Sequence, residues 1–364
     1  MKKTILLVLV LTSGLTTKVT NADFTFGTPT NLGPTINSQY VESAPFISPD
    51  GLSLLFASDW PDGSLDYDLW VTTRASTSEP WGEPVKLGQM INTPDTEWHP
   101  SITADGLELY FDSDRPGGEG SQDLWVSKRE STADEWGAPV NLGLAINTSE
   151  FEEAASISPD GLVLVWDSDR PGGFGESDIW MSTRSTRDDP WGPPVNLGPN
   201  INTRDLEATA ALSADGRALF FTAWPWSQGY GDFDIWMARK SNDSTDWNTP
   251  VNLGPIINTA YSEYCPSISS DGMTLYFSDL PMPRPGGYGL EDIWQAPIIP
   301  IVDLNNDGIV DANDMCIIIV HWGTDESLCD IGPMPWGDGI VDVQDLIVLA
   351  EHLFEEIPPT EPVE

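Results

Sequence analysis

The chain has 364 residues, of which 16 are basic and 57 acidic, giving a formal net charge of −41. A charge of this size repels nucleic acid and anionic membranes, so the composition argues against a nucleic-acid partner. The hydrophobic content of 40% is enough for packed cores, which excludes a disordered chain.

The first residues predict a secretory signal peptide, residues 1–22. Lys2 and Lys3 precede a short apolar run, and small residues then lead to Ala22, after which we expect cleavage. The run is shorter than the roughly 20 apolar residues of a membrane-spanning helix, and no other stretch could span a bilayer. We therefore expect a soluble protein that is secreted or held at the cell surface.

Residues 23–299 are predicted to contain five copies of one repeat. Asp-Gly pairs begin at residues 50, 105, 160, 215 and 271, and an Asp-(Ile/Leu)-Trp triplet follows each pair. Each unit reads as four short strands with turn signals between them and no helical periodicity. This pattern is typical of a β-propeller blade.

The front of the chain is predicted to close the ring. Only four outer strands of the Trp-Gly-x-Pro-Val type follow the triplets, and residues 26–37 match residues 81–92 of the next unit. A strand supplied from the front would complete the last blade and remove sheet edges. The predicted fold is an all-β five-bladed propeller of four-stranded antiparallel blades, with the N-terminal strand closing the last blade.

The repeat resembles the WD40-like propeller repeat called PD40, which is best known from TolB. The resemblance rests on ISPDGLSLLF, ISPDGLVLVW and ISSDGMTLYF and on loops containing SDRPGG, and it covers about residues 26–297. It implies a binding platform whose repeat carries no catalytic motif. The TolB propeller has six blades, whereas five are predicted here.

The loop DSDRPGGEGSQDLW, residues 112–125, returns at residues 167–180 and in part at residues 278–287. Because repeat proteins reuse framework residues, we interpret these loops as structural. We expect each arginine to form a partly buried ion pair with a recurring acid, such as the aspartate of its triplet, while the glycines permit a tight connection. The expected pairs are Arg115–Asp123, Arg170–Asp178 and Arg284–Asp292.

Positions that break the repeat are better candidates for a ligand site. They are Glu97, Trp98 and His99, where the second unit begins, and Trp224, Trp226 and Tyr230, in an aromatic loop that replaces the arginine loop of the fourth. The strand order places both groups on one face near the central channel. Exposed aromatic side chains beside acids are typical of carbohydrate or peptide sites. Packing between blades is the alternative for each tryptophan.

Residues 300–356 are predicted to form a small α-helical domain with calcium loops. A calcium loop needs oxygen ligands at positions 1, 3, 5, 7, 9 and 12 and a glycine at the sharp turn. Residues 303–314 meet all these requirements, and a helix over residues 312–322 is expected to follow. The predicted ligands are Asp303, Asn305, Asp307, Ile309 through its carbonyl, Asp311 and Asp314.

A second copy, residues 337–354, keeps part of this pattern. Its predicted ligands are Asp338, Ile340 through its carbonyl, Asp342 and Asp345, with Asp330 reaching in from an enlarged loop. Met334 and Trp336 stand at positions 1 and 3 and cannot supply side-chain oxygen ligands. We therefore expect the second site to be weaker than the first.

Two loop–helix units with aspartate at position 12 resemble a type I dockerin over about residues 301–356. The resemblance implies Ca²⁺ as the cofactor and a cohesin-like or other extracellular protein as the partner. Dockerins often accompany polysaccharide-degrading enzymes. Residues 357–364 are expected to be a disordered tail.

Three cysteines are too few for a scaffold of many disulfides. Cys316 and Cys329 are close in sequence, and a disulfide between them is consistent with an exported chain. Cys265 lies in a different segment and is expected to be a buried thiol.

These observations favour a secreted, non-catalytic protein whose propeller face binds a glycan or a protein and whose C-terminal domain attaches it to an extracellular assembly. One alternative is a glycoside hydrolase or lyase on the same propeller, which carboxylates converging from pattern-breaking positions would favour. Another is a structural propeller with a calcium-stabilised cap. The sequence contains no Ser-His-Asp order, no HExxH and no P-loop motif.

Overall fold

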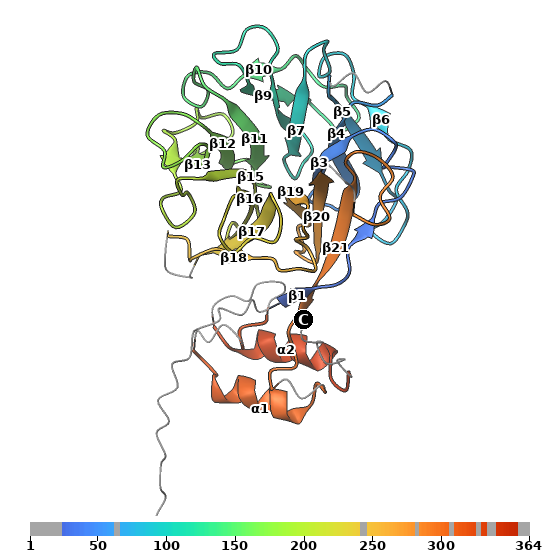
Figure 1. Ribbon diagram of the computed structural model, residues 1–364, viewed down its shortest axis with the longest axis vertical. Coiled ribbons are helices and arrows are strands. Elements are labelled where there is room, and N and C mark those ends of the chain that lie inside the picture. Colours follow the sequence, from blue (N-terminus) through green and yellow to red (C-terminus); the bar gives the residue numbers. More distant parts are fainter. Residues whose placement is uncertain are drawn as a thin grey trace, which may run out of the picture.

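The computed structural model describes residues 24–61, 66–240, 246–280, 284–305, 309–324, 329–332 and 340–355. The predicted signal peptide and C-terminal tail lie outside this part of the chain. Five antiparallel β-sheets form a ring around a central channel (Figure 1). The predicted five-bladed all-β propeller is therefore confirmed.

In each blade the first strand lies innermost, and the next strands follow outward to a two-residue strand at the rim. Blade 1 contains β3 (Glu42–Ile47), β4 (Ser53–Ser58), β5 (Asp68–Thr73) and β6 (Val85–Lys86). Blade 2 contains β7 (Glu97–Ile102), β8 (Glu108–Ser113), β9 (Asp123–Lys128) and β10 (Val140–Asn141). Blade 3 contains β11 (Glu152–Ile157), β12 (Val163–Ser168), β13 (Asp178–Thr183) and β14 (Val195–Asn196).

Blade 4 repeats the same order with slightly longer inner strands. It contains β15 (Leu206–Leu212), β16 (Ala218–Trp224), β17 (Asp234–Arg239) and β18 (Val251–Asn252). Blade 5 contains β19 (Ser262–Ile268), β20 (Thr274–Leu280) and β21 (Ile293–Pro300), with β2 (Thr30–Asn31) as its outer strand.

The front of the chain closes the ring, as the repeat count predicts. In β2, Thr30 lies opposite Gln295 of β21, and Asn31 lies opposite Trp294. A further short strand, β1 (Phe24–Phe26), pairs with the end of β21. Because backbone pairing joins the two ends of the propeller, every blade has an outer strand and the ring is continuous.

Apolar side chains of neighbouring blades pack against each other and form the core. The second strand of every blade carries a large aromatic residue that is at most 2% exposed: Phe56, Phe111, Trp166, Phe221 and Phe277. The Ile-Asn pairs of the repeat support this core from the connections between blades. Asn92, for example, accepts a hydrogen bond from the Leu69 amide (2.8 Å) and donates to the Leu69 carbonyl (3.0 Å).

A buried glutamate stands at the head of each inner strand. In blade 2, Glu97 accepts hydrogen bonds from the amide and hydroxyl of Thr93, at 2.8 and 2.7 Å, and so fixes the connection from blade 1. The Arg115 guanidinium donates to the same carboxylate at 2.9 Å. The equivalent pairs are Arg170–Glu152 (3.1 Å) and Arg284–Glu263 (3.0 Å).

Each of these arginines pairs with a recurring acid, as predicted, but the acid is the buried glutamate and not the aspartate of the triplet. The Asp123 carboxylate accepts hydrogen bonds from the amides of Glu119 (2.6 Å) and Gly120 (3.1 Å) instead, and thereby holds the glycine-rich loop. The loop packs so closely that a Cβ on Gly120 would lie 2.2 Å from the Glu150 carbonyl oxygen. Asp178 and Asp292 hold their own loops in the same way.

The chain leaves the propeller on the face of the Asp-Gly turns, because β21 runs toward those turns and ends at Pro300. Two short helices follow, α1 (Ala312–Val320) and α2 (Val343–Glu351), and Figure 1 shows them outside the ring. Their apolar side chains form a separate cluster that includes Ile318 and Leu349. No helix in the described part of the chain is long and apolar enough to cross a lipid bilayer.

Cys316 and Cys329, for which the sequence left a disulfide open, are both thiols in the structure. Cys316 is exposed on α1, whereas Cys329 is buried in the cluster between the helices, so the two thiols face different environments. Cys265 is a buried thiol, as predicted.

The Glu97–Arg115 pair generates a prediction about stability. The variant Arg115→Met leaves the buried Glu97 carboxylate without its cation, and we expect it to lower the free energy of unfolding by about 3–5 kcal/mol. Urea denaturation at pH 7 measures this loss. Arg204, whose side chain is 90% exposed, provides the control, because Arg204→Met should change stability by less than about 0.5 kcal/mol. Equal stability of the two variants would contradict the assignment.

Candidate functional site

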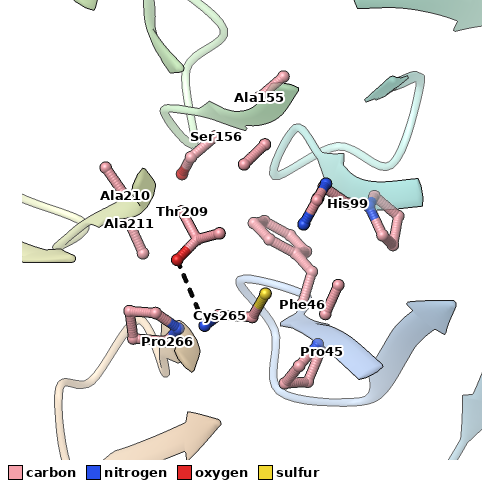
Figure 2. Close-up of a pocket in the computed structure, with 13 residues that line it drawn as sticks. Pro45, Phe46, His99, Ala155, Ser156, Thr209, Ala210, Ala211, Cys265 and Pro266 are labelled. Carbon is pink, nitrogen blue, oxygen red and sulfur yellow. Dashed lines mark hydrogen bonds between the residues drawn. The ribbon is translucent and has the colours of Figure 1, made fainter. Parts of the chain in front are cut away.

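A cavity of about 540 Å³ lies at the mouth of the central channel, on the face where the inner strands begin. His99 and Thr209 line both this cavity and a narrower space of about 40 Å³ farther along the channel. Figure 2 shows the narrow space, with Phe46, prolines and alanines around it. It has room for little more than water, so the mouth is effectively a blind pocket.

Most of the residues that line the cavity occupy positions where the five repeats differ. The position directly after the buried glutamate holds Ser43, Trp98, Glu153, Ala208 and Tyr264. Opposite these residues, on the second strands, stand Ala57, Asp112, Asp167, Thr222 and Ser278. The position before each triplet holds Tyr67, Gln122, Ser177, Phe233 and Glu291. The anchoring glutamates and aspartates are constant, whereas these three rows vary, as expected of a ligand site on a repeated framework.

A β-bulge in every inner strand turns one further side chain toward the channel. The bulge residues have φ angles between 42° and 52°, a conformation that non-glycine residues seldom adopt, and they are Ala44, His99, Ala154, Thr209 and Cys265. The strand register shifts at the same places. Bulges re-aim side chains, and such strained conformations are common at functional sites.

His99 and Asp112 form an ion pair on one side of the cavity, with Nδ1 and Oδ1 2.8 Å apart. Asp112 is fully buried and also accepts hydrogen bonds from the Gln122 side chain (2.7 Å) and the Ala154 amide (3.0 Å). Burial favours the neutral imidazole, but the Asp112 carboxylate and the Cys265 thiol outweigh it and raise the pKa of His99 well above its usual value. The raised pKa favours the imidazolium form of His99, in which Nδ1 donates to Asp112.

Glu153 and Asp167 lie opposite each other on β11 and β12. Asp167 is 6% exposed, and its Oδ1 accepts a hydrogen bond from the Thr209 amide at 2.9 Å. The Glu153 carboxyl group forms no hydrogen bond or ion pair with any other described residue. Burial, reinforced by Asp112, raises the pKa of Glu153 to about 7, and burial together with Glu153 raises the pKa of Asp167 well above its usual value.

A fourth carboxyl group, Glu291, reaches the cavity from blade 5. The Tyr264 hydroxyl donates a hydrogen bond to it and lies 3.0 Å from the Ser43 hydroxyl. Burial, with a smaller contribution from the carboxylates of Asp279 and Asp59, raises the pKa of Glu291 to about 7. The cavity therefore contains acids that hold their protons near neutral pH.

Aromatic rings form other parts of the wall. The rings of Tyr67 and Trp98 pack together with centroids 3.8 Å apart, and Phe233 and Tyr264 also line the cavity. The Trp98 indole N–H is buried and has no hydrogen-bond partner among the described residues. A pocket with apolar rings and a few convergent polar groups can bind and orient a small polar ligand, and its protonated carboxyls can donate protons.

The residues proposed from the sequence fall into two groups. Trp98 and His99 line the cavity, but Glu97 lies beneath it as part of the framework. Trp226 also belongs to the framework, because its indole N–H donates to Glu207 at 2.8 Å in the place where other blades use arginine. The remaining candidates are 37% and 51% exposed and lie outside the cavity lining: Trp224 and Tyr230.

Four carboxyl groups of the cavity were not predicted from the sequence: Asp112, Glu153, Asp167 and Glu291. They could not be distinguished among 57 acidic residues by composition or motif. A row-by-row comparison of the repeats would have singled out Glu153, because no other repeat has an acid directly after the anchoring glutamate.

The first predicted calcium loop is organised around Asp314. Its carboxylate accepts hydrogen bonds from the amides of Leu304 (2.8 Å), Asn305 (3.2 Å) and Asp311 (2.8 Å). The Asp311 side chain caps α1 by accepting from the Asn313 amide. These bonds draw the beginning and end of the loop together.

The second loop repeats this arrangement around Asp345, which accepts hydrogen bonds from the amides of Gly332 (2.8 Å) and Asp342. Asp330 therefore occupies the place that Asp303 has in the first loop, and the two are 7% and 8% exposed. Asp307 and Asp338 lie outside the described residues. Within the described ranges, no three His, Cys, Asp or Glu side chains are grouped as a metal site requires.

No family model and no curated protein matches the chain. Among solved structures, TolB from Acinetobacter baumannii is 16% identical over 72% of this chain and 56% of that protein, with a TM-score of 0.40, so the chain spans just over half of that TolB. A putative TolB from Agrobacterium tumefaciens is 17% identical over 76% and 99%, with a TM-score of 0.44. An α-L-arabinofuranosidase from Lactobacillus brevis is 13% identical over 73% and 92%, with a TM-score of 0.50. At these identities the likeness concerns the fold alone.

The raised pKa of Glu153 predicts a pH-dependent stability. Below about pH 4.3 the carboxyl is protonated in both the folded and unfolded chain, and stability falls as the pH rises from there through about 7. We expect Glu153→Gln to raise the free energy of unfolding by about 1–2 kcal/mol at pH 8, after allowance for solvent screening, and to have little effect at pH 4.

Urea denaturation at both pH values measures this difference. Glu176→Gln is the matched control, since Glu176 is exposed in a loop of the same blade and should show no such pH dependence. A loss of stability in Glu153→Gln at pH 8 would show that the carboxylate is compensated in the folded protein.

Proposed function

We propose that the protein binds a carbohydrate in the cavity at the mouth of the propeller. The observation that carries this proposal is a cavity of about 540 Å³ lined by residues from the varied positions of the repeats. Its size lies within the range of small-molecule sites, and it combines aromatic walls with polar groups. A purely structural propeller would not need the repeats to differ at these positions.

The two kinds of lining residue suit the two kinds of sugar surface. The ring faces of Trp98 and Phe233 can cover the apolar faces of a sugar. Gln122 and Thr222 can exchange hydrogen bonds with the hydroxyl groups at the sugar edge, as can the carboxyl groups. The blind end of the channel limits the bound portion to a few sugar units.

In this proposal the C-terminal segment attaches the propeller without covering its mouth. The chain leaves on the face opposite the cavity, so a partner on α1 and α2 would leave the cavity open. The proposed segment is a dockerin-like module that binds a cohesin-like or other extracellular protein, in a protein exported by residues 1–22. One arrangement supports this module. Asp314 and Asp345, each at the end of its loop, accept hydrogen bonds from backbone amides at the start of the same loop.

Calcium is the cofactor that this proposal requires, because the loops carry hard oxygen donors. The first loop would hold it through Asp303, Asn305, Asp307, the Ile309 carbonyl, Asp311 and Asp314. The second would use Asp330, Asp338, the Ile340 carbonyl, Asp342 and Asp345. Its third position falls on Gly332, which has no side-chain ligand, so we propose weaker binding there.

Glycoside hydrolysis is a second candidate, favoured by one observation. Glu153 has a pKa of about 7 and lies opposite Asp167, so the cavity contains both a proton donor and further carboxyl groups. Such a set could supply the acid and base that glycosidases use. We place binding first because the residues and the cavity support it without requiring a catalytic geometry.

The carbohydrate proposal predicts a specific effect of removing one aromatic wall. We expect Phe233→Ala to weaken binding of a captured oligosaccharide by about tenfold, which corresponds to about 1.4 kcal/mol of lost contact with the aromatic ring. Isothermal titration calorimetry against a panel of soluble oligosaccharides measures the affinity. Phe174→Ala is the control, because Phe174 is 50% exposed and does not line the cavity.

The same samples separate the two candidate functions. Chromatography of each oligosaccharide after incubation with the protein would reveal products of hydrolysis. Binding without products supports a binding protein, and products that disappear in Glu153→Gln support a hydrolase. Absence of binding across the panel contradicts both candidates.

The calcium proposal predicts that chelation loosens the C-terminal segment and spares the propeller. We expect amides of α1 and α2 to exchange about 100-fold faster after chelation, relative to calcium at 100 times its Kd. Hydrogen-exchange mass spectrometry measures this change, with the inner strands of the propeller as an internal control. Unchanged exchange in both helices would show that calcium does not hold this segment.

A further inference from the structure

The cavity has an unbalanced charge. The residues that line it include four carboxyl groups and one histidine but no lysine or arginine. His99 is already paired with Asp112, at 2.8 Å. Among the described residues, no salt bridge joins Glu153, Asp167 or Glu291 to a basic side chain.

Carboxylates in such a place are costly unless a cation or hydrogen bonds compensate them. Asp167 is 6% exposed and accepts a single hydrogen bond from the described residues, and Glu153 accepts none. Burial keeps the pKa of Glu153 and Glu291 at about 7, so these groups hold protons in the absence of a cation. A positively charged group in the cavity would supply the missing compensation.

The aromatic residues point to the type of cation. Tyr67, Trp98, Phe233 and Tyr264 line the same cavity as the carboxyl groups. The faces of aromatic rings attract organic ammonium groups, and aromatic cages beside carboxylates are the usual means of recognising them. A small, strongly hydrated metal ion would gain little from such walls.

We propose that the cavity selects a carbohydrate that carries protonated amines, as deacetylated amino sugars do. This inference rests on the proposed carbohydrate function and names its ligand class. Glu153 and Asp167, which lie opposite each other on β11 and β12, receive the ammonium group, and the aromatic rings line the same cavity. Anionic polysaccharides are excluded by the same carboxyl groups and by the net charge of −41.

Binding is linked to proton release. A bound cation favours the ionised carboxylates, so Glu153 and Asp167 lose protons as the ligand enters. The affinity for a ligand of fixed charge therefore rises with pH between about 5 and 8. Choline is a suitable probe of this linkage, because its quaternary ammonium group does not titrate.

The test is a calorimetric comparison on the full chain at pH 7. The probes are a glucosamine tetramer, the N-acetylglucosamine tetramer, cellotetraose and choline. We expect the glucosamine tetramer to bind at least about tenfold more tightly than its acetylated form, since a desolvated ammonium–aromatic contact and its carboxylate partners are lost on acetylation. Choline affinity should increase from pH 5 to pH 8.

Glu153→Gln tests the residue that distinguishes blade 3. It removes the charge and nearly preserves the shape, and the Glu153 carboxyl group forms no hydrogen bond to a described residue, so the fold should tolerate it. We expect the preference for the glucosamine tetramer to fall to about threefold or less and the pH dependence of choline binding to decrease. Glu176→Gln, the exposed control in the same blade, should retain both.

The outcomes separate this inference from the proposed function. Equal binding of acetylated, deacetylated and glucose tetramers overturns ammonium selection and leaves carbohydrate binding in place. Binding of choline alone, lost in Glu153→Gln, supports the ammonium site and contradicts a carbohydrate ligand. Failure of all four probes to bind overturns the inference, and the wider oligosaccharide panel then decides the proposed function by itself.

Discussion

The structure depends on the buried glutamate at the head of every inner strand. In blade 2 the Glu97 carboxylate holds the connection from the preceding blade through Thr93 and the outer loop through Arg115. In blade 4 the Trp226 indole replaces the guanidinium, and the glutamate remains. Because this glutamate fixes both connections at the mouth, the residue directly after it can differ between repeats while the blade still folds. Most of these variable residues line the ligand cavity.

The cavity combines strained backbone with buried carboxyl groups. Each inner strand bulges at a residue with positive φ, and in blade 2 that residue is His99, which lines both the cavity and the narrow space beyond it. Glu153 and Asp167 face each other in the next blade, and no salt bridge joins either of them to a described basic side chain. Both features cost folding free energy, and neither is needed to close a propeller. Their concentration at one mouth is the physical reason to regard it as a binding site.

The repeat allowed the five-bladed architecture to be predicted, but it did not indicate which residues line the cavity. Asp-Gly turns and the displaced outer strand determine blade count and closure, because both follow from local turn chemistry and strand pairing. The partner of Arg115 was not predictable, since Asp123 and Glu97 are both acids within reach of the loop and only the three-dimensional path decides between them. The bulges leave no sequence signal, because Ala44, His99 and Cys265 adopt the same backbone conformation. Asp330 stays a predicted ligand of the second loop, and the adjoining segment is tied to that loop by the hydrogen bond from the Gly332 amide to Asp345.

A crystal structure of the full chain with a bound oligosaccharide would locate the ligand directly. We expect sugar density in the mouth cavity, stacked against Trp98 or Phe233 and within hydrogen-bond distance of Glu153. Density on the exposed rings of Trp224 and Tyr230, with the cavity empty, would contradict this expectation and would move recognition to the aromatic loop of blade 4.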